Sequence, residues 1–267
     1  MPIHRLTGLL QAAIDGGALP VTESQVQEAK AAHASAMLWV LRLERELLAV
    51  SDLLTEATIE TRVLKGAAVA HLDYSRPEQR SFIDLDILVR GEHFDRAVQT
   101  LIAAGFVRPL QEPRPGFDRR FDKGTTLVAP AGYELDLHRT FVLGPWGLLV
   151  DLDDLWGDDG QEFVVGGHRL RALSHHYRLL HACYHAALGN WPLRLASLRD
   201  VAEMVLATGY AETDIRTLAS RWQVEAVVAA AIADAWRLLG LPSTEVSAWA
   251  QRYVPSRQDE AKLNLYT

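Results

Sequence analysis

The chain has 267 residues, of which 49% are hydrophobic and 23% charged, and its formal net charge at pH 7 is −7. This composition excludes a disordered chain, and the acidic balance disfavours bulk binding to nucleic acid or to an anionic membrane. A single cysteine, Cys183, excludes an intramolecular disulfide, and no apolar run approaches the roughly 18 residues of a membrane span. We therefore expect a soluble, cytoplasmic protein without a signal peptide.

The N-terminal part is rich in Ala, Leu, Arg and Glu with helical spacing of apolar residues. We expect one or two long helices over residues 23–55, with an apolar stripe that includes Leu38, Leu41 and Leu48. The middle differs, because residues 61–140 contain 12 basic and 11 acidic side chains, short β-type runs and several glycines. The charge excess of the protein therefore belongs to its two flanks.

The pattern predicts strands in the middle part at 61–64, 82–89, 106–107, 119–128 and 133–139, and helices at 67–72 and 92–104. A turn at Pro130-Ala131-Gly132 joins the last two strands as a hairpin. From Leu173 onward we expect helices at 173–188, 193–208, 211–221 and 224–239. The expected domains are an N-terminal helical segment (1–58), an α/β core (59–172) and a C-terminal helical domain (173–267).

The most informative segment is the strand that contains Asp84 and Asp86. Alternate side chains of a strand share a face, so both carboxylates lie opposite the apolar residues Ile83, Leu85 and Ile87. Two like charges on one half-buried face repel each other, and a divalent cation relieves that repulsion. Carboxylate oxygens suit Mg²⁺ or Mn²⁺. The alternative is an exposed edge strand whose aspartates stay hydrated.

A second acidic strand follows about fifty residues later. Glu134, Asp136 and His138 share one face there, and Leu135 and Leu137 share the other. If the two strands are neighbours, Asp136 joins the pair of aspartates. The clean alternation of both strands favours a cation site.

An apolar strand leads into Lys65-Gly66 and then into a helix, upstream of the aspartates. A glycine turn at a helix start lets backbone N–H groups contact an anion, and the lysine adds positive charge beside phosphates. Such turns are common, so the signal depends on its position near the carboxylates.

Together, the segments Leu64-Lys65-Gly66, Arg80 to Val89 and Glu134 to His138 resemble the bacterial uncharacterised nucleotidyltransferase family of the polymerase-beta-like superfamily. The resemblance implies an α+β fold in which a small mixed sheet is backed by helices, with N-terminal helices and a C-terminal helical domain. It implies transfer of NMP from an NTP with release of pyrophosphate. The resemblance also implies that Asp84 and Asp86 bridge two Mg²⁺ or Mn²⁺ ions, and that Asp136 binds the ion that activates the acceptor hydroxyl.

One departure concerns the phosphate-binding turn. The wider superfamily usually has Gly-Ser there, whereas this chain has Lys65-Gly66-Ala67 without a hydroxyl. Arg80 and Arg62 are candidates to pair with phosphate oxygens in compensation, and either is equally compatible with a surface role.

His138 is a candidate substrate contact, and further candidates come from the C-terminal part. His181 and His185 lie four residues apart on one helix face, and Arg194 follows. Histidines at this spacing are more often packed in the protein interior, and no accompanying Glu or Cys cluster indicates a zinc site. The proline-rich, basic segment 108–123 is a loop that holds an anionic acceptor or acts as a lid, or else a solvated connection between strands, which is the commoner case.

The residues do not identify the acceptor, and the resemblance implies either a peptide, as in lasso-peptide tailoring, or a small molecule. Three alternatives are left open by the sequence: a toxin that adds nucleotides to tRNA, transfer of the γ-phosphate in the same site, and a non-catalytic module that binds a partner. The acidic net charge disfavours tRNA, and retention of all three aspartates disfavours a non-catalytic module.

Overall fold

The computed structural model describes residues 5–189, 192–208 and 211–266. The chain forms two compact units, one of Met1–Arg139 with Glu162–Ala172 and one of Thr140–Gln161 with Leu173–Thr267. The helices of the first 58 residues therefore share a unit with the sheet.

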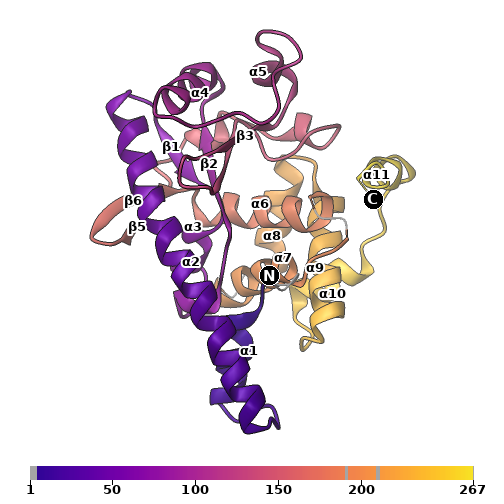
Figure 1. The fold of residues 1–267 in the computed structure, drawn as a ribbon. Coiled ribbons are helices and arrows are strands. Elements are labelled where there is room, and N and C mark those ends of the chain that lie inside the picture. Colours follow the sequence, from indigo (N-terminus) through magenta and orange to yellow (C-terminus); the bar gives the residue numbers. More distant parts are fainter. Residues whose placement is uncertain (1–4, 190–191, 209–210, 267) are drawn as a thin grey trace. The chain divides into compact units, whose positions relative to one another are not determined.

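The first unit is built on a mixed sheet (Figure 1). Its strands in the described part of the chain are β1 (Thr61–Val63), β2 (Asp84–Val89), β3 (Gly124–Val128), β4 (Glu134–His138), β5 (Gln161–Val165) and β6 (His168–Ala172), in the order β3-β4-β2-β1-β6-β5. β2 pairs in parallel with β4 and antiparallel with β1. β3 and β4 form the expected hairpin. The expectation of an α+β fold with a small mixed sheet is confirmed.

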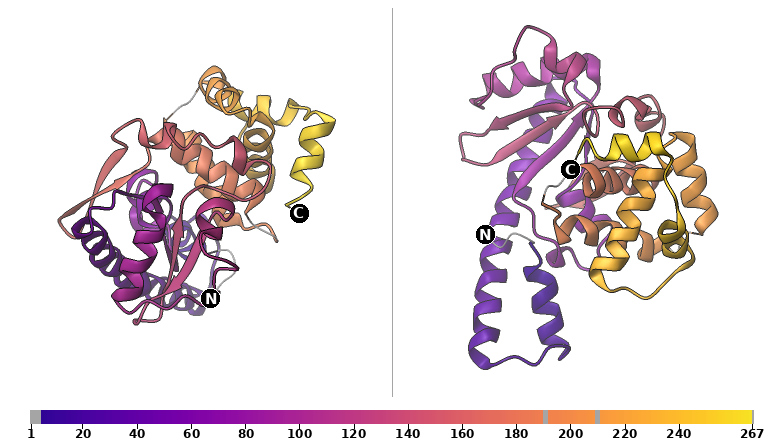
Figure 2. Two further views of the ribbon diagram at one scale, coloured as in Figure 1. Left: turned by 90° about the horizontal axis from the view of Figure 1, so that it is seen from above. Right: turned by 90° about the vertical axis from the view of Figure 1, so that its right-hand side faces the viewer.

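One long helix dominates the helical part of this unit. The helices are α1 (Thr7–Asp15), α2 (Glu23–Glu56), α3 (Ala67–Leu72), α4 (Phe94–Ala103) and α5 (Phe117–Phe121), with 3₁₀ turns η1 (Pro77–Gln79) and η2 (Gly91–His93). α2 begins with a capping box in which Thr22 and Gln25 bond each other's backbone N–H groups. α1 lies alongside the first half of α2, which is clearest in the right-hand view of Figure 2.

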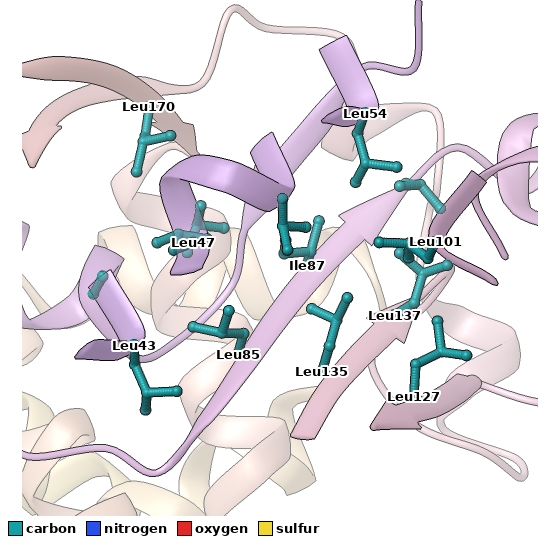
Figure 3. Close-up of a cluster of buried hydrophobic side chains, with 14 of the residues drawn as sticks. Leu43, Leu47, Leu54, Leu85, Ile87, Leu101, Leu127, Leu135, Leu137 and Leu170 are labelled. Carbon is teal, nitrogen blue, oxygen red and sulfur yellow. The ribbon is translucent and has the colours of Figure 1, made fainter. Parts of the chain in front are cut away.

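The core of the first unit lies between α2, α4 and one face of the sheet. Leu43, Leu47 and Leu54 of α2 pack toward Leu85 and Ile87 of β2, with leucines of β3 and β4 beside them (Figure 3). The expected stripe was partly wrong, because the side chains of Leu38 and Leu41 are 71% and 61% exposed. Two rows of apolar residues on α2 fit the helical spacing, and the sheet covers the one that contains Leu43.

The strand expected at 119–128 begins later than predicted. Residues 117–121 form α5, which follows Gly116 in the left-handed conformation (φ 77°). The rings of Phe117 and Phe121 meet across one helical turn, with centroids 5.3 Å apart. Residues 106–107 contribute only an isolated bridge between Val107 and Val128. The apolar pattern was therefore right for β3 itself and wrong for the segment before it.

Strands β5 and β6 were not predicted individually. Phe163, Val165, Leu170 and Ala172 are buried and alternate with exposed residues, and Gly166-Gly167 joins the two strands. This is the period-two pattern of a hairpin. Val63 of β1 pairs with Ala172 in parallel, which attaches this hairpin to the sheet.

The second unit is helical. Its helices among the described residues are α6 (His175–Leu188), α7 (Leu195–Thr208), α8 (Glu212–Arg221), α9 (Glu225–Leu239), α10 (Glu245–Arg252) and α11 (Arg257–Leu263), with 3₁₀ turns η3 (Gly147–Leu149) and η4 (Asp154–Trp156). The four helices predicted here are present, and α10 and α11 follow them. Among the residues that the structure describes, no helix is long and apolar enough to cross a membrane.

Candidate active site

Polar side chains form a line across three strands on the sheet face opposite the core. Asp86 of β2 lies directly opposite Asp136 of β4, and Asp136 lies directly opposite Thr126 of β3. Asp84 lies opposite Glu134 in the same register. Directly opposed residues of paired strands point to the same face. The prediction that Asp136 joins the two aspartates if the strands are neighbours is therefore confirmed in the geometry.

Asp86 is the buried centre of this arrangement. Its Oδ1 atom lies 2.8 Å from Nζ of Lys65 and accepts a hydrogen bond of 3.0 Å from Nε2 of His138. The side chains of Asp86 and His138 are almost fully buried. In the structure the Nε2 atom of His138 orients the Asp86 carboxylate, and the expected contact of His138 with substrate stays a prediction.

Lys65 reaches Asp86 because of the local chain path. The N–H group of Leu64 donates to the carbonyl of Asp86 over 3.0 Å, which fixes the end of β1 beside β2. Lys65 follows at once, and Gly66 then turns the chain into α3 with φ 53° and ψ −116°. This conformation is open to glycine and strained for other residues. Lys65 was expected to bind phosphate, and the structure places its ammonium group among the carboxylates.

Replacing Gly66 with alanine is expected to lower the free energy of unfolding by about 1–3 kcal/mol, the usual cost of a strained backbone conformation. The new Cβ atom would also lie 3.2 Å from the Phe82 ring. Gly91→Ala is the matched control, because nothing lies within 4 Å of a Cβ at Gly91. Urea unfolding of both variants provides the comparison. Equal stability of the two would contradict the strained turn.

The charges of the site depend on one another. Burial alone would raise the pKa of Asp86, but the Lys65 ammonium and His138 hold that pKa well below its usual value. Burial likewise opposes the charge of Lys65, and the carboxylates of Asp86 and Asp84 outweigh it and raise the Lys65 pKa. Burial and the Asp86 charge raise the pKa of Asp84, an effect that Lys65 and Arg5 reduce. The geometry thus favours an ionised Asp86 and a protonated Lys65.

Two residues that contact the aspartates, Arg5 and Thr126, were not among the candidates from the sequence. Nη1 of Arg5 lies 3.9 Å from Oδ1 of Asp84, and no sequence signal connects residues 79 positions apart. Oγ1 of Thr126 donates a hydrogen bond of 2.5 Å to Oδ1 of Asp136. This second contact could have been found by counting back from the Pro130-Ala131-Gly132 turn, which sets Thr126 opposite Asp136.

The residues present fit a divalent cation. Oδ2 of Asp86 is buried and has no hydrogen-bond partner among the described residues, and an unsatisfied buried carboxylate oxygen is unfavourable. One possible ligand atom from each of Asp86, Asp136 and His138 lies within 4.8 Å of the others. Oxygen ligands of this kind suit Mg²⁺ or Mn²⁺.

A cavity of about 520 Å³ opens beside Asp136. Residues of the segment from Arg108 to Thr126 line it together with Glu134, Asp136 and His138. The segment is held by an ion pair between Arg108 and the buried Asp118. Its expected role toward an acceptor stays a prediction.

The two arginine candidates have local partners. Nη1 of Arg80 donates a hydrogen bond of 3.1 Å to the carbonyl of Gly66, so Arg80 supports the turn that positions Lys65. Arg62 is buried and pairs with Glu60 at 2.8 Å. On β1, Arg62 pairs with Leu88, the residue before the last residue of β2.

The remaining candidates belong to the second unit. His181 is buried on α6, with its ring centroid 4.7 Å from that of Phe141 and 6.5 Å from that of His185. Arg194 is exposed, and its backbone carbonyl accepts from Ser197 at the start of α7. Their expected contacts with substrate stay predictions.

Comparison with solved structures finds distant likenesses. The solution structure of the antibiotic-resistance factor ANT(2'')-Ia has 11% identity and a TM-score of 0.48 over 68% of this chain and 91% of its own. A crystal structure of ANT(2'')-Ia with adenylyl-2''-tobramycin has 12% identity and a TM-score of 0.48 over 68% and 97%. The lincosamide adenylyltransferase LnuA, bound to lincomycin, has 18% identity and a TM-score of 0.41 over 60% and 94%. No match was found among curated proteins.

The family described as uncharacterised nucleotidyltransferase matches residues 3–240. The match includes the turn at Lys65, the strands of the three aspartates and most of the helical unit. It confirms the resemblance drawn from the segments between residues 60 and 140. The chain belongs to this nucleotidyltransferase family.

Proposed function

We propose that this nucleotidyltransferase moves a nucleoside monophosphate from an NTP to a hydroxyl or phosphate oxygen of an acceptor, with the aspartates Asp84, Asp86 and Asp136 as its metal-binding and catalytic residues. The main support is the facing pair of Asp86 and Asp136, which presents a buried and unsatisfied carboxylate oxygen beside a second carboxylate.

In the proposed step, the acceptor oxygen forms a bond to the α-phosphorus as the bond from that phosphorus to the β-phosphate bridging oxygen breaks. Pyrophosphate leaves with the bonding electrons. Asp136 takes the acceptor proton, and its hydrogen bond from Thr126 holds the carboxylate in place for this role. His138 and Lys65 keep Asp86 ionised and oriented.

A divalent cation bound by these aspartates would offset charge on the phosphates and make the acceptor hydroxyl easier to deprotonate. Mg²⁺ and Mn²⁺ are the proposed ions, because the available ligands are mainly carboxylate oxygens. Lys65, Gly66 and Arg80 are proposed to complete the phosphate-binding turn at the start of α3.

The cavity beside Asp136 is the proposed acceptor site. Its volume of about 520 Å³ lies within the range of about 300–1,000 Å³ that is usual for small-molecule sites. Its lining includes two basic and four acidic side chains, which favours a small molecule or a peptide side chain over the backbone of tRNA. Tailoring of a lasso-type peptide and modification of a small molecule are both compatible with this size.

Nucleotide binding can be tested without knowing the acceptor. We expect one or more of the four common NTPs to raise the melting temperature of the wild-type protein when Mg²⁺ or Mn²⁺ is present. Ligand at a hundredfold excess over Kd stabilises a protein by about 2.7 kcal/mol. The same nucleotides should not shift the melting temperature when EDTA is present. A shift that is equal with and without metal would contradict a metal-dependent site.

The reaction class can be tested with labelled ATP, or with the NTP that the melting experiment selects. In the absence of an added acceptor, water is expected to replace it slowly. Nucleotidyl transfer then yields α-labelled AMP and γ-labelled pyrophosphate. Transfer of the γ-phosphate yields ADP and labelled inorganic phosphate instead, and that product would overturn the proposal. Labelled tRNA ends in a parallel reaction with tRNA would contradict the proposed acceptor class but not the reaction.

A further inference from the structure

The two oxygens of Asp86 have different surroundings. Oδ1 lies 2.8 Å from Nζ of Lys65 and accepts a hydrogen bond of 3.0 Å from Nε2 of His138. Oδ2 has no hydrogen-bond partner within residues 5–189, 192–208 and 211–266. In the Asp86 carboxylate, one oxygen therefore has two polar partners, and the other oxygen has none among these residues. A cation can bind the open oxygen while Lys65 keeps its place on the other.

Lys65 lies among the carboxylates of the site. Its ammonium group is 2.8 Å from Oδ1 of Asp86, which lies directly opposite Asp136 and two residues from Asp84 on β2. Its side chain is 17% exposed, so it is enclosed with these carboxylates and is not extended into solvent. Three carboxylates outnumber the two cationic side chains Lys65 and Arg5, so the cluster keeps a net negative charge that favours a cation.

The backbone keeps Lys65 in this position. The hydrogen bond from Leu64 N–H to the Asp86 carbonyl fixes the chain immediately before it. The Gly66 turn, supported by Arg80, fixes the chain immediately after it. Because the backbone is fixed on both sides of Lys65, its side chain loses less conformational entropy on contacting Asp86 than the side chain of a mobile surface lysine would.

We propose that this site binds one divalent cation, at Oδ2 of Asp86 and the carboxylate of Asp136, and that the Lys65 ammonium replaces the second cation of a two-metal site. This inference rests on the proposed function and changes two parts of it: the metal count, since the family resemblance leads to two ions, and the role of Asp84, which no longer binds a metal ion. Lys65 then has a permanent electrostatic role beside any contact with phosphate.

Electron paramagnetic resonance of bound Mn²⁺ tests the metal count. Two ions in a two-metal site lie about 3.5–4 Å apart, so their spins couple, whereas a single ion gives an uncoupled spectrum. The wild-type protein is titrated with Mn²⁺, with and without an NTP analogue that has a methylene group between the α- and β-phosphorus atoms. We expect one bound Mn²⁺ per chain and an uncoupled spectrum.

Removal of the lysine charge should open the second position. In Lys65→Ala and Lys65→Gln, we expect two bound Mn²⁺ per chain and a coupled spectrum. The glutamine variant retains a hydrogen-bond donor for Asp86, which protects the fold if the alanine variant fails to melt cooperatively. Lys30→Ala is the matched control, because Lys30 is exposed on α2, and its spectrum should equal that of the wild type.

A coupled Mn²⁺ pair in the wild-type protein would overturn the inference. So would a single uncoupled ion in a Lys65→Gln variant that melts cooperatively, because the lysine would then not exclude a second ion. If neither variant folds, the wild-type spectrum alone decides. A wild-type protein that binds one Mn²⁺ but forms no α-labelled product would contradict the proposed function and leave the metal count intact.

Discussion

Nucleotidyl transfer is expected to fall on the order of 10³-fold or more in the variant Asp86→Asn. The buried carboxylate is the central charged group of the polar face, and asparagine removes its charge while keeping its shape. Loss of one preorganised electrostatic group in an active site typically costs about 10²–10³ in rate. Loss of a cation ligand adds to that cost. The rate of α-labelled product formation at saturating NTP measures the effect.

Two further variants separate catalysis from folding. Asp86→Asn also leaves Lys65 without its closest counter-charge, so part of its effect could be a loss of stability. Asp136→Asn leaves the Lys65–Asp86 pair intact and keeps an oxygen that accepts from Thr126, and it should lose activity to a similar degree. Asp52→Asn, an exposed position on α2, should retain wild-type activity. Full activity in a folded Asp136→Asn variant would contradict the proposed site.

The second large effect concerns the core beneath the sheet. Leu47→Ala is expected to lower the free energy of unfolding by about 2–5 kcal/mol, the usual cost of removing a buried leucine side chain. Leu47 is 1% exposed and packs against the sheet face opposite the aspartates. Chemical denaturation followed by circular dichroism measures the change.

Leu41→Ala is the control for this prediction, because it makes the same chemical change on the same helix. The Leu41 side chain is 61% exposed, so its truncation should change stability by less than about 0.5 kcal/mol. If the two variants were equally stable, the assignment of the buried face of α2 would be wrong.

The candidate site was predictable where it depends on local alternation. Asp84 and Asp86 are separated from Leu85 and Ile87 by the pleat of one strand, and period-two patterns are legible in a sequence. The partner Asp136 needed only the further assumption that the two acidic strands are neighbours. Those three residues are the part of the site that the sequence determines most directly.

The contacts of Lys65 and Arg5 were not predictable in the same way. Both are long, flexible side chains that contact the aspartates only because of the tertiary structure. Residue spacing and composition do not indicate which carboxylate such a side chain pairs with. Which of the two apolar rows of α2 is buried also depends on the tertiary structure. Leu38 and Leu43 fit the helical period equally well, and only the location of the sheet decides which is buried.

The order of the segments along the chain has a consequence for proteolysis and truncation. The chain passes from one compact unit to the other three times, after Arg139, Gln161 and Ala172. A single cut after Arg139 would therefore not release the aspartate-bearing unit whole, because β5 and β6 would remain on the other fragment. Strand β1 would lose its neighbour β6 and expose unpaired backbone groups prone to aggregation. The aspartate-bearing sheet thus depends on a polypeptide segment that is synthesised only after the helical unit has begun.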